Sequence, residues 1–182
     1  MEPVILKTPR LTLRPLGLED LKTVHAYASN RENTRYMYYL PNDTLEETTA
    51  FLQSVSVEWR KAQPDFYEFA IVCQQQQIGA VSLYLDDSRT EGELGWILHH
   101  AWWGNGYATE AAIAVRDFGR ELRLKRLIAH CDCRNRPSQR VMEKLGMTLT
   151  SNSGTRIYPK TGETAGELMY TLTLSPKGGD LD

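Results

Sequence analysis

The stretch that decides the fold is Trp102-Trp103-Gly104-Asn105-Gly106-Tyr107-Ala108-Thr109-Glu110-Ala111. Residues Glu93 to Leu98 before it are typical of a strand, and apolar side chains after it recur at helical spacing from Tyr107 to Leu122. This order predicts a strand, a glycine turn and a helix. The two glycines let a ligand approach the backbone, and the free N–H groups at a helix start favour a phosphate. The alternative is that the glycines only allow a tight bend.

The chain has 182 residues and a formal net charge of -2, with charges of both signs spread along it. This length fits one domain, and we expect a single domain over residues 1–174 and a loose polar tail over residues 175–182. The charge pattern does not support nucleic-acid binding. The sequence contains neither an apolar run of membrane-helix length nor a signal peptide, so we expect no membrane partner and a cytoplasmic location.

Three cysteines, Cys73, Cys131 and Cys133, lie in apolar, strand-like surroundings. In such surroundings a thiol usually behaves as a small hydrophobic group, so we interpret all three as reduced and structural. Cys131, Cys133 and the adjacent His130 could begin a zinc site, but a fourth ligand at a suitable spacing is missing. No metal is expected.

The other elements are predicted from periodicity and from turn residues. The predicted strands are Leu11 to Arg14, Phe66 to Cys73, Ile78 to Leu85, Glu91 to Leu98, Arg126 to Asp132, Met147 to Thr150 and Glu167 to Leu174, and the predicted helices are Leu18 to Tyr27, Thr44 to Lys61, Tyr107 to Leu122 and Pro137 to Gly146. An antiparallel meander precedes the glycine turn, and a strand-helix-strand crossover follows it. The fold class is therefore mixed α/β, with helices against a mixed, mostly antiparallel sheet.

Two other nucleotide-binding motifs contain comparable glycines. A dinucleotide-binding fold requires a third glycine where Thr109 stands, and repeated strand-helix units rather than one crossover after a meander. A P-loop requires Gly-Lys followed by Ser or Thr after the turn. The sequence has neither pattern, which disfavours both folds.

Three blocks of the sequence resemble the GNAT superfamily of N-acetyltransferases. The strand Glu93 to Leu98 and the glycine turn are similar to its coenzyme A motif, and Asn135-Arg136-Pro137-Ser138 with Glu143-Lys144-Leu145-Gly146-Met147 is similar to its next block. The opening Thr8-Pro9-Arg10-Leu11-Thr12-Leu13-Arg14-Pro15 resembles the RimJ/RimL branch, which acetylates N-terminal amines of ribosomal proteins and various small amines. One departure is Ala101, because the family often has Gln or Arg at this position. We expect this difference to weaken the contacts with the pyrophosphate but not to abolish them.

The resemblance implies a sheet that is splayed between the strands Glu93 to Leu98 and Arg126 to Asp132, with acetyl-CoA as cosubstrate in the gap. Main-chain groups of Ile97 and Leu98 are then expected to bind the oxyanion and the pantetheine amides. The residues that the resemblance assigns to cofactor binding are Ile97, Leu98, Trp103, Gly104, Asn105, Gly106, Tyr107, Ala108, Thr109, Asn135, Ser138 and Lys144.

Acetyl transfer requires a base for the amine and an acid for the departing thiolate. Glu93 is the candidate base, with an exposed, ion-paired glutamate as the structural alternative; His99 and His100 at the end of the same strand are further candidates. Ser138 matches the family position from which a hydroxyl reaches the coenzyme sulfur. Its alternative role is to satisfy free backbone donors at a helix start.

The polar and aromatic connection around residues 30–41 is expected to bind the acceptor, through Glu32, Tyr36 and Tyr38. Ordinary packing of a long loop is the alternative. The sequence and the resemblance thus predict an acetyl-CoA-dependent N-acetyltransferase that acts on a primary amine, either a protein N-terminus or a small molecule. The sequence itself does not determine the oligomeric state, and a homodimer is an expectation from the resemblance alone, since family members often form dimers. The alternative function is a catalytically silent sensor that binds acyl-CoA.

Overall fold

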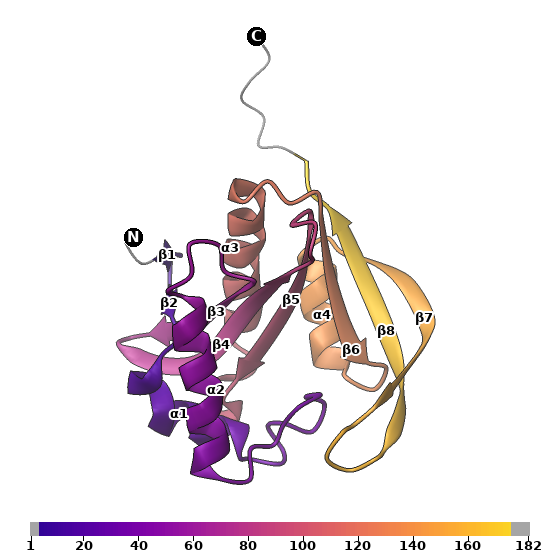
Figure 1. Ribbon diagram of the computed structural model, residues 1–182. Coiled ribbons are helices and arrows are strands. Elements are labelled where there is room, and N and C mark those ends of the chain that lie inside the picture. The colour runs from indigo at the N-terminus through magenta and orange to yellow at the C-terminus, as the bar shows by residue number, and fades with distance from the viewer. Residues whose placement is uncertain (1–3, 176–182) are drawn as a thin grey trace.

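The computed structural model describes residues 4–175, which form an eight-stranded sheet with helices on both faces (Figure 1). The strands are β1 (Leu6–Lys7), β2 (Thr12–Pro15), β3 (Phe66–Cys73), β4 (Gln76–Leu85), β5 (Glu91–Leu98), β6 (Arg126–Asp132), β7 (Thr148–Ile157) and β8 (Thr164–Thr173). The helices are α1 (Leu21–Ala28), α2 (Leu45–Glu58), α3 (Tyr107–Glu121) and α4 (Arg136–Lys144), with short 3-10 turns η1 (Leu18–Asp20) and η2 (His100–Trp102). The expected tail lies outside the described residues, except for Ser175.

The strand order across the sheet is β1-β2-β3-β4-β5-β6-β8-β7. Among the described residues, β5 and β6 form the only parallel pair, and every other neighbouring pair is antiparallel. The helix α3 makes the crossover between these two parallel strands. The predicted mixed, mostly antiparallel sheet is therefore confirmed.

Two layers of helices bury the two faces of this sheet. Helices α1 and α2 pack over one face, where Val24, Leu52 and Val55 meet Ala70 and Ala80. On the other face, α3 and α4 pack over a larger apolar cluster, whose buried members include Ala111, Val115, Met142, Leu13, Phe69, Ile71, Val81, Leu83 and Leu127. No helix within residues 4–175 is both long and apolar enough to cross a membrane.

β5 and β6 are neighbours only over their first residues. Their paired residues are Glu91 with Arg126, Gly92 with Leu127 and Glu93 with Ile128. Both strands continue past these pairs and diverge, which opens the middle of the sheet (Figure 1). The rest of β5 therefore has no β6 partner on this side, and the splay implied by the family resemblance is confirmed.

The final hairpin differs from the prediction, because the polar segment expected as a loop belongs mostly to the strands. β7 extends to Ile157, and β8 begins at Thr164 rather than Glu167. β7 is an edge strand with register shifts between Leu149 and Gly154, and edge strands tolerate exposed polar residues and bulges. Its Gly/Asn/Ser composition therefore misled the prediction.

The turn expected over Gln74 to Gln77 is also shorter, since β4 begins at Gln76. Gln74 and Gln75 make the turn with positive φ of 49° and 66°. All three cysteines are free, and Cys73 and Cys131 are buried as expected. The prediction was wrong for Cys133, which is exposed because it follows the end of β6.

Candidate active site

A cleft of about 960 Å³ occupies the gap between the diverging strands. β5 from Glu93 to Leu98 lines one side, residues of β6 and α4 line the other, and the glycine turn and part of the α1–α2 connection lie at its ends. Every residue predicted to bind the cofactor or the acceptor lines this cleft except Asn105. The Asn105 side chain instead donates to the carbonyl oxygens of Trp102 and Trp103, at 3.3 and 3.0 Å, and so holds the turn itself.

The glycine turn has the geometry of an anion cradle. Gly104 and Gly106 both adopt φ of +79°, a left-handed conformation that favours glycine. Gly106 is the N-cap of α3 and offers no side chain to cap it, so the first backbone N–H groups of the helix remain available. A Cβ atom on Gly104 would meet no atom within 4 Å. Open space, free donors and the helix dipole together fit a pyrophosphate.

The N-terminal block holds this turn in place from about a hundred residues away. The Glu110 carboxylate accepts hydrogen bonds from the Thr8 hydroxyl at 2.5 Å and from the Arg10 backbone and guanidinium at 3.0 and 2.6 Å. Arg10 also donates to the Asn105 carbonyl at 3.0 Å and lies 4.5 Å from the centre of the Tyr107 ring. Partial burial raises the pKa of Glu110, but these hydrogen bonds outweigh it and leave the pKa below its usual value.

Arg10→Ala is expected to lower the free energy of unfolding and to weaken acetyl-CoA binding. The loss of unfolding free energy should be only about 1 kcal/mol, because the guanidinium is half exposed. The contribution of the pair is present at neutral pH and disappears as the pH falls through the carboxyl range, because the folded pKa is depressed. Denaturant unfolding and calorimetric titration would measure both effects. Arg126→Ala removes another exposed ion pair, with Glu91, and should leave binding unchanged; an equal loss of affinity in both variants would contradict a specific role for Arg10.

The end of β5 is also tied to the α1–α2 connection. The Leu98 carbonyl accepts from the Asn33 side-chain amide at 2.9 Å and from the Trp103 indole at 3.0 Å. The Asn33 oxygen in turn accepts from the His100 backbone at 2.6 Å. Asn33 is buried, and it fixes the segment that carries Glu32 and Tyr36. Because this carbonyl is already occupied, the backbone groups of β5 that remain for a ligand lie before it.

Across the gap, α4 begins with the predicted family block. The Asn135 side chain caps the helix by accepting from the Ser138 backbone N–H at 3.2 Å. The Ser138 hydroxyl is half-buried, lines the cleft and has no hydrogen-bond partner among residues 4–175. Lys144 is exposed at the far end of this helix. On the wall opposite β5, the Ser138 hydroxyl and the Lys144 ammonium thus have no hydrogen-bond or ion-pair partner within the described residues 4–175.

Glu93 does not stand alone on β5. Its carboxylate Oε1 lies 2.8 Å from Nδ1 of His130, which comes from β6 two residues beyond the last pair of the two strands. The hydrogen bond to Glu93 raises the pKa of His130 against the effect of partial burial. The structural alternative for Glu93 was an exposed glutamate in an ion pair. Glu93 does have a partner, and that partner is a histidine rather than a lysine or arginine.

The acceptor end of the cleft is aromatic and charged. Arg134, between β6 and α4, lies 5.7 Å from the ring centre of Tyr36, and Arg156 of β7 lies 6.0 Å from that of Tyr38. These two contacts hold the α1–α2 connection against the β6–α4 turn and the last hairpin. Arg156 is buried and forms an ion pair with Glu167 at 2.6 Å. Lys160 of the same hairpin bridges to Asp43 and Glu47 at 3.0 and 2.8 Å. These contacts give the connection a defined position beside Glu93.

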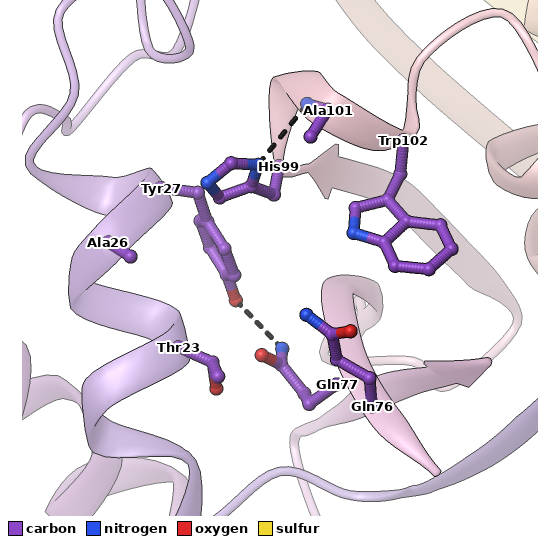
Figure 2. A pocket seen from close by; sticks show the side chains of 8 residues that line it. All are labelled: Thr23, Ala26, Tyr27, Gln76, Gln77, His99, Ala101 and Trp102. Atoms are coloured by element: carbon purple, nitrogen blue, oxygen red, sulfur yellow. Dashed lines mark hydrogen bonds between the residues drawn. The ribbon is translucent and has the colours of Figure 1, made fainter. Parts of the chain in front are cut away.

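The other two candidate bases do not line the cleft. His99 faces a separate pocket of about 200 Å³ between α1, the start of β4 and η2, where its Nδ1 accepts from the Ala101 backbone N–H at 3.2 Å (Figure 2). His100 is exposed and stacks on His99 at 4.4 Å between ring centres. Trp102 lines both the small pocket and the cleft. The geometry therefore favours the Glu93 pair over His99 and His100.

Sequence reasoning missed His130, Arg156 and Glu167 as members of the site. His130 is on the same face of the sheet as Glu93, and the predicted parallel pairing of their strands was the one signal that could have brought them together. Arg156 lies in the segment that was expected to be a loop, so no position on a strand could be given to it.

The sequence of residues 10–148 matches the family described as "Acetyltransferase (GNAT) domain". This match covers most of the chain, and the chain belongs to the GNAT acetyltransferase family. It is therefore an N-acetyltransferase that uses acetyl-CoA, as the sequence resemblance predicts. The splayed strands and the glycine cradle fit this cosubstrate.

Among the relatives of the chain, one has a name that states no acceptor and another has a name that states spermidine. An uncharacterized N-acetyltransferase of Bacillus subtilis, YnaD, is 31% identical over 78% of this chain and 81% of its own length. Spermidine N(1)-acetyltransferase of Escherichia coli is 27% identical over 75% of this chain and 72% of its own length.

Solved structures agree with the fold. An acetyltransferase of the GNAT family from Bacillus anthracis superposes with a TM-score of 0.81 at 28% identity, over 93% of this chain and 98% of the other. The ribosomal L7/L12 protein acetyltransferase RimL, solved in complex with coenzyme A, also has a TM-score of 0.81, over 96% and 100% of the two chains. Its identity of 17% makes this a likeness of fold.

Proposed function

We propose that the protein transfers the acetyl group from acetyl-CoA directly to a primary amine bound at the Tyr36 and Tyr38 end of the cleft. The observation that carries the proposal is the open edge of β5, which runs from the glycine cradle to the Glu93 pair with Ser138 on the facing wall. A thioester laid along this edge has its carbonyl between a proton acceptor and a free hydroxyl. Attack by an amine from the aromatic end then requires no movement of the strands.

Direct transfer is favoured over a covalent acyl-enzyme by the state of the cysteine in the cleft. Cys131 lines the cleft, but burial raises the pKa of its thiol to about 11. Such a thiol is protonated at neutral pH, and the thiolate is the nucleophilic form. The amine itself therefore attacks the thioester carbon.

Each residue of the site has a proposed role in this reaction. The turn from Trp103 to Thr109 binds the pyrophosphate, with Asn105 shaping the turn, and Lys144 adds a positive charge near it. Main-chain groups of Ile97 and Leu98, apart from the occupied Leu98 carbonyl, bind the pantetheine arm and the oxyanion, and Asn135 orients the start of α4. Glu32, Tyr36 and Tyr38 bind the amine.

Ser138→Ala is expected to lower kcat by about tenfold to a hundredfold, because the departing thiolate loses its proton donor, while the melting temperature stays close to that of the parent. The backbone N–H of residue 138 still meets the Asn135 cap, so the helix start is preserved. Steady-state kinetics and a thermal melt measure the two effects. A turnover equal to that of the parent would assign Ser138 to the helix start alone.

The test of the proposed function is free-thiol release from acetyl-CoA with a panel of ribosomal-protein N-terminal peptides, polyamines, amino acids and aminoglycosides. A strong responder supports the enzyme and identifies its acceptor. Silence across the panel, with acetyl-CoA still raising the melting temperature, would favour the alternative of an acyl-CoA sensor. Silence without a thermal shift would overturn the role of the cradle.

The acceptor class rests on charge and on the relatives together. On the acceptor side of the cleft, Glu32 and the His130-bound Glu93 offer carboxylates that favour a cationic amine, whereas the charge of Glu167 is balanced by Arg156. The names of the relatives leave both a polyamine and a protein N-terminus as acceptors.

A homodimer and a cytoplasmic location stay predictions, which size-exclusion chromatography with light scattering and cell fractionation would test.

A further inference from the structure

One histidine occupies the point where the sheet opens. The chain has four histidines, and His130 is the one that lines the cleft. It follows Ile128, the last β6 residue paired with β5, by two positions and therefore projects from the same face of the strand. Its side chain is 26% exposed, so the ring is held by its surroundings while still accessible.

The contact with Glu93 determines which ring nitrogen of the neutral histidine carries the proton. A carboxylate can only accept, so at 2.8 Å from Glu93 the His130 Nδ1 atom must carry the hydrogen. Nε2 is then the atom with the free lone pair, and it has no hydrogen-bond partner among residues 4–175. This is the arrangement in which a third group orients a base toward its substrate.

We propose that His130 Nε2 accepts the proton of the acceptor amine and that Glu93 is a positioning residue that orients the His130 ring. The proposal rests on the proposed acetyl transfer. Sequence analysis gave the role of base to a single residue, with Glu93 as its candidate. The proposal divides this role between two side chains. Glu93, whose side chain is 47% exposed, then acts through the imidazole rather than on the substrate.

The charges around His130 suit a base for an amine. Glu93 from β5 and Glu167 from β8 favour the imidazolium form, and Arg156 from β7 opposes it, while partial burial also opposes it. From the α1–α2 connection, Tyr38 contacts Arg156 rather than the imidazole, and Glu32 and Arg35 line the cleft. The net effect is a pKa of His130 above its usual value, which lies near neutral pH.

The proton and bond changes balance as follows. The ammonium acceptor gives one proton to His130 Nε2, and the neutral nitrogen attacks the thioester carbonyl carbon. A carbon–nitrogen bond forms and the carbon–sulfur bond breaks, with its electron pair leaving on sulfur. The Ser138 hydroxyl gives its proton to the departing sulfur and takes up the second proton that the nitrogen loses, so that the hydroxyl is restored. His130 then returns its proton to water. The products are the N-acetyl amine, coenzyme A and one proton in solution.

The experiment compares the pH dependence of kcat/KM in the parent, His130→Gln and Glu93→Gln, using the best acceptor of the panel. In the parent, kcat/KM should fall on the acid side as the base is protonated. Glu93→Gln should keep this acid limb but move it to lower pH, since the imidazolium loses its carboxylate partner. In His130→Gln the acid limb should disappear, and kcat at neutral pH should fall about a hundredfold.

Two controls keep the outcome clear. His25→Gln changes a histidine that contacts Thr48 at 2.8 Å between α1 and α2, and its profile should equal that of the parent. If His130→Gln does not fold, His130→Ala assayed with added imidazole replaces it, and recovery of turnover by imidazole is expected. Acetyl-CoA titration of each variant should give a Kd close to that of the parent.

The opposite pattern would overturn the inference. If His130→Gln keeps the acid limb while Glu93→Gln loses it, Glu93 is the base and His130 only its partner. Absence of recovery by imidazole in a folded His130→Ala protein that binds acetyl-CoA would contradict the inference in the same way. A parent without turnover on any amine is a different result, because it contradicts the proposed function rather than the division between these two residues.

Discussion

Gly104→Val is expected to weaken acetyl-CoA binding about tenfold to a hundredfold. The Gly104 φ of +79° lies in a region that a β-branched residue does not adopt without strain. A valine would either force the turn to another conformation or place methyl groups in the open space that the cradle presents. Each backbone N–H lost from a phosphate costs about 1.5–3 kcal/mol, and 1.4 kcal/mol corresponds to a factor of ten in affinity.

Gly162→Val is the matched control for this change. Gly162 has φ of +71°, a Cβ atom there would also meet nothing within 4 Å, and it lies in the turn between β7 and β8. Both variants should lose roughly 1–2 kcal/mol of unfolding free energy from the strained backbone. Only Gly104→Val should lose affinity in calorimetric titration. Equal affinities in the two variants would remove the glycine turn from the binding site.

Gly79→Ala is expected to lower the free energy of unfolding by about 3 kcal/mol and also to weaken acetyl-CoA binding. Gly79 of β4 pairs with Leu98 of β5, and a Cβ atom on it would lie 2.2 Å from the Ile97 carbonyl oxygen and 2.9 Å from the Leu98 Cα atom. Both are backbone atoms, so neither strand can relieve the overlap by turning a side chain, and overpacking of this kind costs about 1–3 kcal/mol or more.

The affinity should fall in Gly79→Ala because the displaced segment is the end of β5 that lines the cleft. Gly119→Ala is the control, since a Cβ atom there would stand 3.4–3.6 Å from leucine methyl groups and the residue lies inside α3. Alanine is favoured over glycine in a helix by about 1 kcal/mol, so this variant should be at least as stable as the parent. Urea unfolding with and without acetyl-CoA measures the stability of each variant and its affinity for the ligand. If Gly79→Ala were as stable as the parent, that result would contradict the close approach of β4 and β5.

The fold was readable from the sequence wherever the signal was local. The strand before Trp102, the glycine turn and the start of α3 at Tyr107 follow one another along the chain, and periodicity with turn residues determined them. The helix predicted from Thr44 to Lys61 was likewise readable, since α2 begins directly after Thr44. Only the first residues of β7 were predicted, because an edge strand with bulges can be polar, and nothing local distinguishes the rest of it from a loop.

The site divides in the same way between local and distant contacts. The cradle was predicted because its parts lie within a few consecutive residues. Asn105 is the exception, because its side chain bonds within the turn and does not line the cleft. The pair of Glu93 and His130 joins residues 37 apart, and the bond from Arg10 to Glu110 joins residues 100 apart. Such pairs depend on strand register and on how far β5 and β6 diverge, and these quantities follow from packing of the whole sheet.

The strand order has a consequence for how the protein acquires its activity during synthesis. β6 lies between β5 and β8, so the second wall of the cleft is supported by a strand made near residue 173. Until β8 has left the ribosome, β6 exposes an edge with unpaired backbone groups, and such an edge readily pairs with other chains. The nascent protein can therefore carry a complete glycine turn and still lack a formed cleft. We therefore expect affinity for acetyl-CoA to appear late in translation, so that a ligand present in the cell stabilises only chains that have already passed the aggregation-prone stage.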